Sequence, residues 1–376
     1  MRFINLESCT PGMIVSRDIV NNGVTFLRAG KALKESYIKT LDNLGYKGCY
    51  IEDDFSKYIK MTETISPAVR NEAITLAYEI FSVSKPSQNM IQKQLMESVN
   101  DILDDIVDQI IRNRDESINI ISLKSFDLYT YQHSVDVSVM AVFLGKEYGL
   151  VRSQLIELGK SAFFHDIGKA FISQTILNKP DKLTPEEFEE IKLHPEMGFD
   201  YLKDILYMSK NICESALYHH EKFSGGGYPK GLSGKEIPLF SRIIAIADTY
   251  DAITSKRPYK EAMIASEAYE YIMAASEIQF DPELVQLFVK KVAPFPIGTT
   301  VRLSNNLEGV VKENNSNVMM RPIIQLFNKK EEQSDDEAQI EKIDQAEKTD
   351  KTKQEEYECL DLSDPKNSSI TIVAVL

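Results

Sequence analysis

The clearest apolar pattern in the chain is a stripe of residues between positions 86 and 112. Its members fall three or four residues apart, as do side chains on one face of an α-helix. They are Ile91, Leu95, Val99, Ile102, Ile106 and Ile110. The stripe predicts a long amphipathic helix in a helical region that begins near Pro67. Its apolar face either packs against a helical bundle or forms a homodimer contact that relays a signal, because both uses bury such a face.

Helical patterns continue beyond the stripe to about residue 292. Helices are predicted over 131–148, 153–164, 185–194, 212–220 and 239–252. Thr184 and Glu187 form a capping box with Pro185 at the first helical position, which marks where the third of these helices begins. Pro195 is expected to end that helix at His194, since proline disrupts the helical hydrogen bonds.

The two ends of the chain show shorter, strand-like patterns. In the first unit, strands are expected at Met13–Val15 and Val24–Leu27 around the Asn22-Gly23 turn signal, with a helix over Glu35–Leu44 and a strand over Gly48–Ile51. In the last unit, strands are expected at 301–303, 309–312, 318–326 and 370–376. The first unit shows no pattern that indicates catalysis, and it is interpreted as a structural or sensory appendage.

These patterns predict a mainly α protein with small β-containing units at both ends. The predicted domains are 1–60, a mixed α/β unit, 61–292, a helical domain with its motifs in 128–292, and 293–376, a β unit. Residues 329–358 contain twelve acidic residues and six lysines and almost no apolar side chain. Such a segment cannot bury enough surface to order itself, so 329–357 is predicted to be a disordered acidic insertion. The alternative is a partner-binding arm.

Composition narrows the class of protein. Hydrophobic residues make up 43% of the chain and predict a globular protein, while a formal charge of −14 argues against binding nucleic acid or an anionic membrane. The four cysteines are scattered without a Cys-x-x-Cys pair and are expected to be isolated, reduced thiols. No signal-peptide pattern and no apolar run of about 18 residues is present, which predicts a cytoplasmic protein outside the membrane.

All five histidines of the chain lie between positions 133 and 220. Two motifs stand out among them, His165-Asp166 and His219-His220-Glu221, and Asp248 follows downstream. Imidazole nitrogen suits iron, manganese or zinc, and a carboxylate can bridge two ions. A single histidine is usually a core or surface residue. Five gathered in such motifs indicate a cluster of divalent transition metals instead.

Four segments resemble the HD-GYP family, a branch of the HD metal-dependent phosphohydrolases. They are HDIGK at 165–169, HHEKFSGGGYP at 219–229, RIIAIADTYDAITSKRPYK at 242–260 and FDPELV at 280–285. Their order and spacing make the resemblance specific, and it covers a little under half of the chain. It implies an HD-type helical bundle that hydrolyses cyclic di-GMP to linear pGpG, and further to GMP, in bacterial second-messenger signalling.

The resemblance also implies the roles of individual residues. Two divalent ions, iron or manganese, would be held by His133, His165, Asp166, His194, His219, His220 and Asp248. Asp166 would bridge the ions as a catalytic residue, and Lys169 would place a compact positive charge beside the scissile phosphate. The substrate would be bound by Lys169, Gly227, Tyr228, Pro229, Arg257 and Lys260. The Gly225–Gly227 run would let the backbone approach the ligand, although a tight structural turn would also use these glycines.

The sequence departs from the family pattern at two positions. Ser224 stands where family members usually carry aspartate, and Tyr129 stands where some carry a glutamate ligand for a third metal. Tyr129 predicts two ions rather than three, because a phenol with a pKa of about 10 is a poor ligand. Two alternatives remain: an HD-type phosphohydrolase of another nucleotide, and a catalytically weak module that binds nucleotide or a signalling protein partner.

Overall fold

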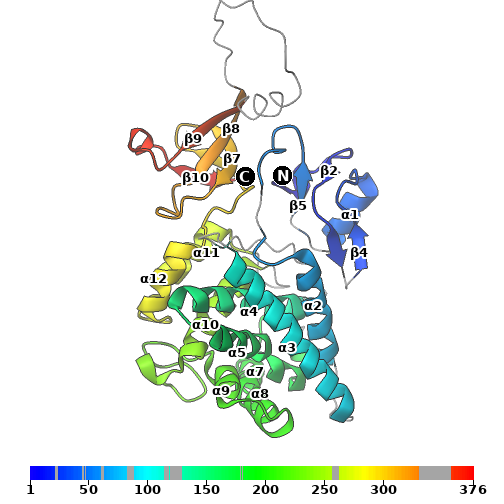
Figure 1. The fold of residues 1–376 in the computed structure, drawn as a ribbon, viewed down its shortest axis with the longest axis vertical. Coiled ribbons are helices and arrows are strands. Elements are labelled where there is room, and N and C mark those ends of the chain that lie inside the picture. The colour runs from blue at the N-terminus through cyan, green and yellow to red at the C-terminus, as the bar shows by residue number, and fades with distance from the viewer. Residues whose placement is uncertain are drawn as a thin grey trace, which may run out of the picture.

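A computed structural model gives the fold of the chain. It describes residues 1–21, 24–44, 46, 48–60, 63–82, 89–113, 118, 129–177, 179, 181–255, 262–329 and 357–376. A helical bundle forms the body of the molecule, and two small β units lie at one end of it, close to both chain termini (Figure 1). The mainly α fold class predicted from the sequence is confirmed. No helix in the described ranges is long and apolar enough to span a membrane.

The bundle is built around one buried helix. Its longer helices are α2 (Pro67–Ser82), α3 (Asn89–Arg112), α4 (Tyr129–Tyr148), α5 (Arg152–Phe164) and α10 (Leu239–Thr254). Shorter ones are α6 (Gln174–Leu177), α7 (Pro185–Ile191), α8 (His194–Asp200), α9 (Lys210–Tyr218), α11 (Ala265–Ala274) and α12 (Pro282–Lys291). Every residue of α4 from Gln132 to Gly145 is buried. A helix that is buried all round must have partners on every side, and α4 packs against α2, α3, α5, α10 and α12.

The apolar stripe of the sequence lies on α3. Val99, Ile102, Ile106 and Ile110 are each at most 3% exposed and belong to the same core as α4. The stripe therefore packs against the bundle of its own chain, which is the first of the two uses predicted for it. The predicted helical region is divided between α2 and α3, and residues 83–88 between them lie outside the described ones.

The break at His194 differs from the one expected. The helix that starts at the Thr184 capping box ends at Ile191, and a new helix, α8, starts at His194. Pro195 stands in the first turn of α8, where its missing N–H would have had no helical partner. The proline thus begins a helix instead of ending one, and the histidine still sits at a helix boundary.

The N-terminal unit contains a sheet in the order β1-β5-β2, formed by β1 (Arg2–Asn5), β5 (Gly48–Glu52) and β2 (Ile14–Val15), beside helix α1 (Glu35–Asn43). Of the two strands predicted to pair around residues 22–23, one is wrong. Strand β4 (Val24–Leu27) pairs with β3 (Ile19–Asn21), not with β2. All four cysteines are unbonded, but Cys9 and Cys49 are not isolated, since their Sγ atoms lie 3.6 Å apart.

The C-terminal unit is a five-stranded antiparallel sheet. Its strands lie in the order β10 (Ile372–Val375), β6 (Thr300–Leu303), β7 (Glu308–Glu313), β8 (Ile323–Lys329) and β9 (Tyr357–Asp361). Strand β9 was not predicted, and residues 318–322 are turns. The predicted acidic insertion falls, from 330 to 356, outside the described residues. The two end units contact one another, because Gln325 donates to the Phe55 carbonyl at 2.7 Å and Phe55 packs on Phe327 and Tyr357.

Asp281 joins two helices that flank α4, and its loss is expected to destabilise the bundle. Its Oδ1 accepts the Glu283 N–H at 2.9 Å to cap α12, and its Oδ2 pairs with Arg242 of α10. Both side chains are at most 9% exposed. Asp281→Ala should cost about 3–5 kcal/mol in urea unfolding, because Arg242 is left buried without its partner. Asp281→Asn keeps the cap and should cost less. A loss of about 1 kcal/mol for the alanine variant, the worth of a cap alone, would contradict this role of the ion pair.

Candidate metal centre

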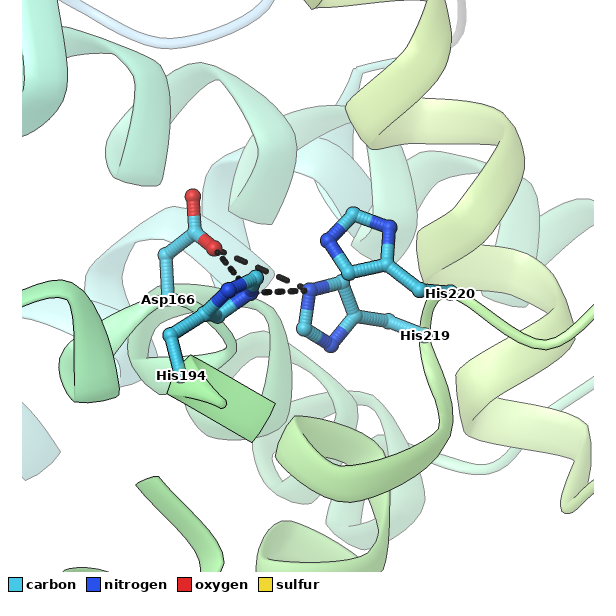
Figure 2. A group of neighbouring side chains, drawn as sticks. All are labelled: Asp166, His194, His219 and His220. Atoms are coloured by element: carbon cyan, nitrogen blue, oxygen red, sulfur yellow. Dashed lines mark hydrogen bonds and ion pairs between the residues drawn. The ribbon is translucent and has the colours of Figure 1, made fainter. Parts of the chain in front are cut away.

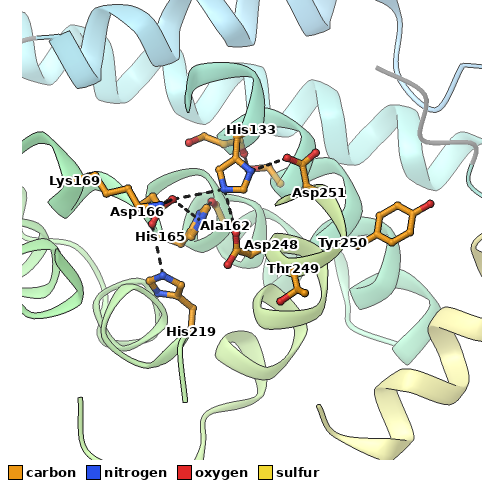
Figure 3. Close-up of polar contacts among 12 residues, drawn as sticks. His133, Ala162, His165, Asp166, Lys169, His219, Asp248, Thr249, Tyr250 and Asp251 are labelled. Carbon is orange, nitrogen blue, oxygen red and sulfur yellow. Dashed lines mark hydrogen bonds and ion pairs between the residues drawn. The ribbon is translucent and has the colours of Figure 1, made fainter. Parts of the chain in front are cut away.

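Three helix ends and two helix interiors bring the predicted ligands together. His165 and Asp166 follow α5, His194 begins α8, and His219 and His220 follow α9. His133 and Asp248 lie within the helices α4 and α10. Helix ends suit this purpose, since a side chain there is fixed by the helix yet points beyond it. Figures 2 and 3 show the side chains converging between the helices.

The seven residues fall into two groups that each fit one metal ion. Asp166, His194, His219 and His220 form the first group, and His133, His165 and Asp248 form the second. Within each group the potential ligand atoms all lie within 4.8 Å of one another. Both groups combine imidazole nitrogen with carboxylate oxygen, the ligand types of iron, manganese and zinc rather than of magnesium or calcium. We refer to them below as the His220 group and the His133 group.

Asp166 lies between the two groups and offers one oxygen to each. Its Oδ1 is 3.3 Å from His194 Nε2 and 3.7 Å from His219 Nε2. Its Oδ2 is 3.3 Å from His165 Nε2 and 3.6 Å from His133 Nε2. This is the arrangement that a carboxylate bridging two ions requires.

Backbone carbonyls orient three of the imidazoles. The Nδ1 atoms of His165, His194 and His219 are 2.7, 2.7 and 2.9 Å from the carbonyl oxygens of Ala162, Ile191 and Ala216. In each case the acceptor is three residues earlier in the chain. An Nδ1–H that donates to a carbonyl leaves Nε2 with its lone pair, so each ring presents Nε2 to the site.

His133 is oriented by a carboxylate that the sequence did not identify. Its Nδ1 is 2.7 Å from Asp251 Oδ2, and both side chains are buried (Figure 3). His133 Nε2 then lies 3.2 Å from Asp248 Oδ1. Asp248 and Asp251 are three residues apart on α10 and therefore share a face of that helix. That spacing was the one signal in the sequence that could have indicated the role of Asp251.

Burial and nearby charges set the protonation states. Burial would raise the pKa of Asp166, but Lys169 and His165 outweigh it and hold that pKa well below its ordinary value. Burial acts likewise on Asp248, where the hydrogen bond with His133 keeps the pKa well below normal. Burial lowers the pKa of His219 to about 4 and the pKa of His220 well below its ordinary value. At neutral pH these carboxylates are charged and these imidazoles neutral, which is the state in which each can bind a cation.

The residues present fit a pair of divalent cations. Asp166 Oδ1 and His165 Nε2 are buried and have no hydrogen-bond partner among the described residues. Unsatisfied buried polar atoms are rare in folded proteins and usually mark a bound ion, water or a functional site. Here they are aimed into the space between the two groups, where a cation would satisfy them.

Lys169 extends beside the shared carboxylate. Its Nζ is 2.5 Å from Asp166 Oδ2, and its side chain is 28% exposed. It lies one turn beyond Asp166 in the 3₁₀ helix η2 (Ile167–Phe171). Gly168 lets η2 pass close to α8, since a Cβ there would meet the His194 carbonyl oxygen at 1.9 Å. Lys169 thus places a cation at the edge of the site, where a phosphate could approach it.

The glycine-rich loop after His220 folds back on itself. A Cβ on Gly227 would lie 2.4 Å from the Lys222 nitrogen, so glycine is needed here for contact with the loop's own backbone. Glu221 Oε1 holds the far end of the loop by accepting the N–H groups of Lys230 and Gly231 at 2.7 and 3.0 Å. Of the two expectations for these glycines, the structural turn accounts for the close approach at Gly227.

The structure describes some of the remaining predicted residues and not others. The Tyr228 ring stacks on the His220 ring, with Pro229 following it. Ser224 ties the loop to a neighbouring segment by donating to the Ile278 carbonyl at 2.8 Å. Arg257 and Lys260 lie outside the described residues, as does the side chain of Tyr129. Their expected roles stay predictions.

Part of the chain is similar to known proteins. The family model described as "HD domain" matches residues 115–284. The chain is 38% identical over 228 residues to Cyclic di-GMP phosphodiesterase PA4108 of Pseudomonas aeruginosa, covering 61% of this chain and 55% of that protein. It is 39% identical to Cyclic di-GMP phosphodiesterase of Thermotoga maritima, covering 46% and 48%. It is also 35% identical to 3′3′-cGAMP-specific phosphodiesterase 3 of Vibrio cholerae, covering 45% and 36%.

Residues 115–284, which contain all seven residues of the histidine and aspartate cluster, thus match the model of an HD domain. The four motifs that resemble the HD-GYP family lie in the same part of the chain. The chain spans about half the length of the first two curated relatives.

Proposed function

We propose that the protein is a metal-dependent phosphodiesterase that hydrolyses cyclic di-GMP to linear pGpG. The observation that supports this best is the position of Asp166, with one carboxylate oxygen toward each group of ligands. A mononuclear or structural metal site would not need two groups that share a buried carboxylate. The names of the relatives from Pseudomonas aeruginosa and Thermotoga maritima support cyclic di-GMP as the substrate.

The seven residues of the two groups would hold two divalent ions, iron or manganese. When bound, such a pair activates a water molecule and neutralises charge on the phosphate. In the hydrolysis, the P–O3′ bond breaks and a water molecule supplies both new groups. Its hydroxyl bonds to phosphorus, and its remaining proton is transferred to the 3′ oxygen. The chain's own residues prepare the site, because Asp251 fixes the His133 ring and three carbonyls fix other imidazoles. Lys169 would bind a phosphate oxygen with its ammonium group.

A second substrate has specific support. Two relatives of similar identity are named for 3′3′-cGAMP, at 35% and 36% identity. Both cyclic dinucleotides have the same phosphodiester backbone, so the metal centre alone does not separate them. The choice would lie in the residues that contact the bases. Arg257 and Lys260 were the expected candidates for guanine or phosphate contacts.

Incubation of the purified full chain with each dinucleotide tests the function. Protein freed of metal by a chelator should be inactive, and added Mn²⁺ or Fe²⁺ should restore hydrolysis of cyclic di-GMP to pGpG. Chromatography of the products separates pGpG from GMP. Faster turnover of 3′3′-cGAMP would make that dinucleotide the substrate in place of cyclic di-GMP. If neither dinucleotide is hydrolysed with Mn²⁺ or with Fe²⁺, the enzymatic function is overturned in favour of a binding module.

Three further expectations stay predictions alongside this function. They are a cytoplasmic location, a signalling protein partner and a homodimer through residues 86–112. For the last, the apolar stripe of α3 is already covered by the chain's own bundle, so a dimer would have to use the other faces of that helix.

A further inference from the structure

His220 is held differently from the other imidazoles of its group. His194 and His219 each have a carbonyl acceptor for Nδ1. Among the described residues, the His220 ring makes ring contacts with His194, His219 and Tyr228 but no hydrogen bond. His220 is also only partly buried, whereas its two neighbours are at most 2% exposed. Contacts between rings must therefore fix its orientation if it is to bind a metal ion with a defined geometry.

Tyr228 provides such a contact from outside the His220 group. Its ring stacks on the His220 ring, with the ring centroids 4.8 Å apart and 27° between the planes. The Tyr228 N–H also donates to the His220 carbonyl oxygen at 3.3 Å, which closes the loop over the histidine.

Lys192 in turn holds the tyrosine. Its Nζ lies 5.6 Å from the centroid of the Tyr228 ring and 5.3 Å from that of Phe188. An ammonium group at this distance from an aromatic ring is attracted by the ring's negative face. Glu189 Oε1 fixes the same ammonium at 2.7 Å. Lys192 stands two residues before His194, so this contact joins the segment that carries His194 to the loop that carries Tyr228.

We propose that Tyr228 is a positioning residue for His220 and that Lys192 holds Tyr228 in place. The two residues then set the metal affinity of the His220 group, while the His133 group is independent of them. The inference rests on the proposed two-metal site and assigns the Gly-Tyr-Pro tyrosine to metal binding instead of substrate contact. It also explains the aromatic residue at this position, since only an aromatic ring can both stack on an imidazole and attract a cation.

Titration of the metal-free full chain with Mn²⁺, followed by electron paramagnetic resonance, tests the inference without any substrate. The wild-type chain should bind two ions tightly. Tyr228→Leu should retain one tight site and weaken the other by about 10–100-fold, the usual effect of losing a residue that orients a ligand. Tyr228→Phe keeps the ring and should bind like the wild type. Lys192→Met should weaken the same site to a smaller extent.

Two reference variants identify the site that is lost. His220→Ala should give the same single tight site as Tyr228→Leu, and combining the two changes should add little. Tyr207→Leu removes a tyrosine that is 84% exposed on the same bundle and should leave both sites intact. Circular dichroism confirms that each variant is folded. If Tyr228→Leu does not fold, Lys192→Met and Tyr228→Phe still test the stack.

The outcomes separate the inference from the proposed function. Two tight sites in folded Tyr228→Leu and Lys192→Met would overturn the positioning role and leave the enzyme intact. Equal weakening at both sites would also overturn it, because the His133 group should not respond. Fewer than two sites in the wild-type chain would count against the two-metal function itself.

Discussion

An Asp166→Asn variant is expected to remain folded and to lose turnover of cyclic di-GMP almost completely. The amide has the shape of the carboxylate, but it carries no charge and places an NH₂ group toward one of the two ligand groups. Changes in residues that merely orient a metal ligand already cost about 10–100-fold. Loss of the residue shared by both groups should therefore exceed about 100-fold. Turnover, the metal content of the purified protein and its melting curve are the measurements.

Asp200→Asn is the matched control, since Asp200 is exposed at the end of α8. It should keep wild-type turnover and metal content. The bridging role of Asp166 would be refuted if the folded Asn variant retained two ions and lost only about tenfold in rate. A loss of one ion but not the other would show that Asp166 belongs to a single group.

The helical part of the fold could be predicted because its helices are long and their apolar faces are regular. Helix α4 was expected from residue 131 and begins at Tyr129, and α10 was expected to residue 252 and ends at Thr254. The strands were less predictable. Strand β3 has only three residues, and β9 adjoins the acidic segment and contains two acidic residues itself, so neither shows a clear apolar pattern. Their partners are also set by pairing with distant segments, which no local pattern contains.

The candidate site shows the same division. The seven expected ligands lie together in the structure. They could be predicted because histidine and aspartate in adjacent pairs have few other uses. The groups that orient them were not visible in the sequence. Three are backbone carbonyls, which every residue possesses, and one is Asp251, which looks like any other helical carboxylate. The stack of Tyr228 on His220 depends on the path of the loop between them and could be recognised only in three dimensions.

Lys169→Met is expected to reduce turnover by about 100–1,000-fold while both metal ions remain bound. The ammonium group lies beside Asp166 at the edge of the centre, where it can reach a phosphate oxygen whose charge grows in the transition state (Figure 3). Methionine preserves the length of the side chain without its charge. Since the charge acts mainly in the transition state, kcat should fall far more than KM changes.

Two variants sharpen this test. Lys169→Arg keeps the charge and should recover part of the lost rate, although its larger guanidinium cannot place the charge at the same point. Lys210→Met is the control, because the Lys210 side chain is 83% exposed and pairs only with Glu214 among the described residues. If Lys169→Met loses metal together with activity, the lysine acts by holding Asp166 in place. If it loses neither, the substrate phosphate does not approach this edge of the site.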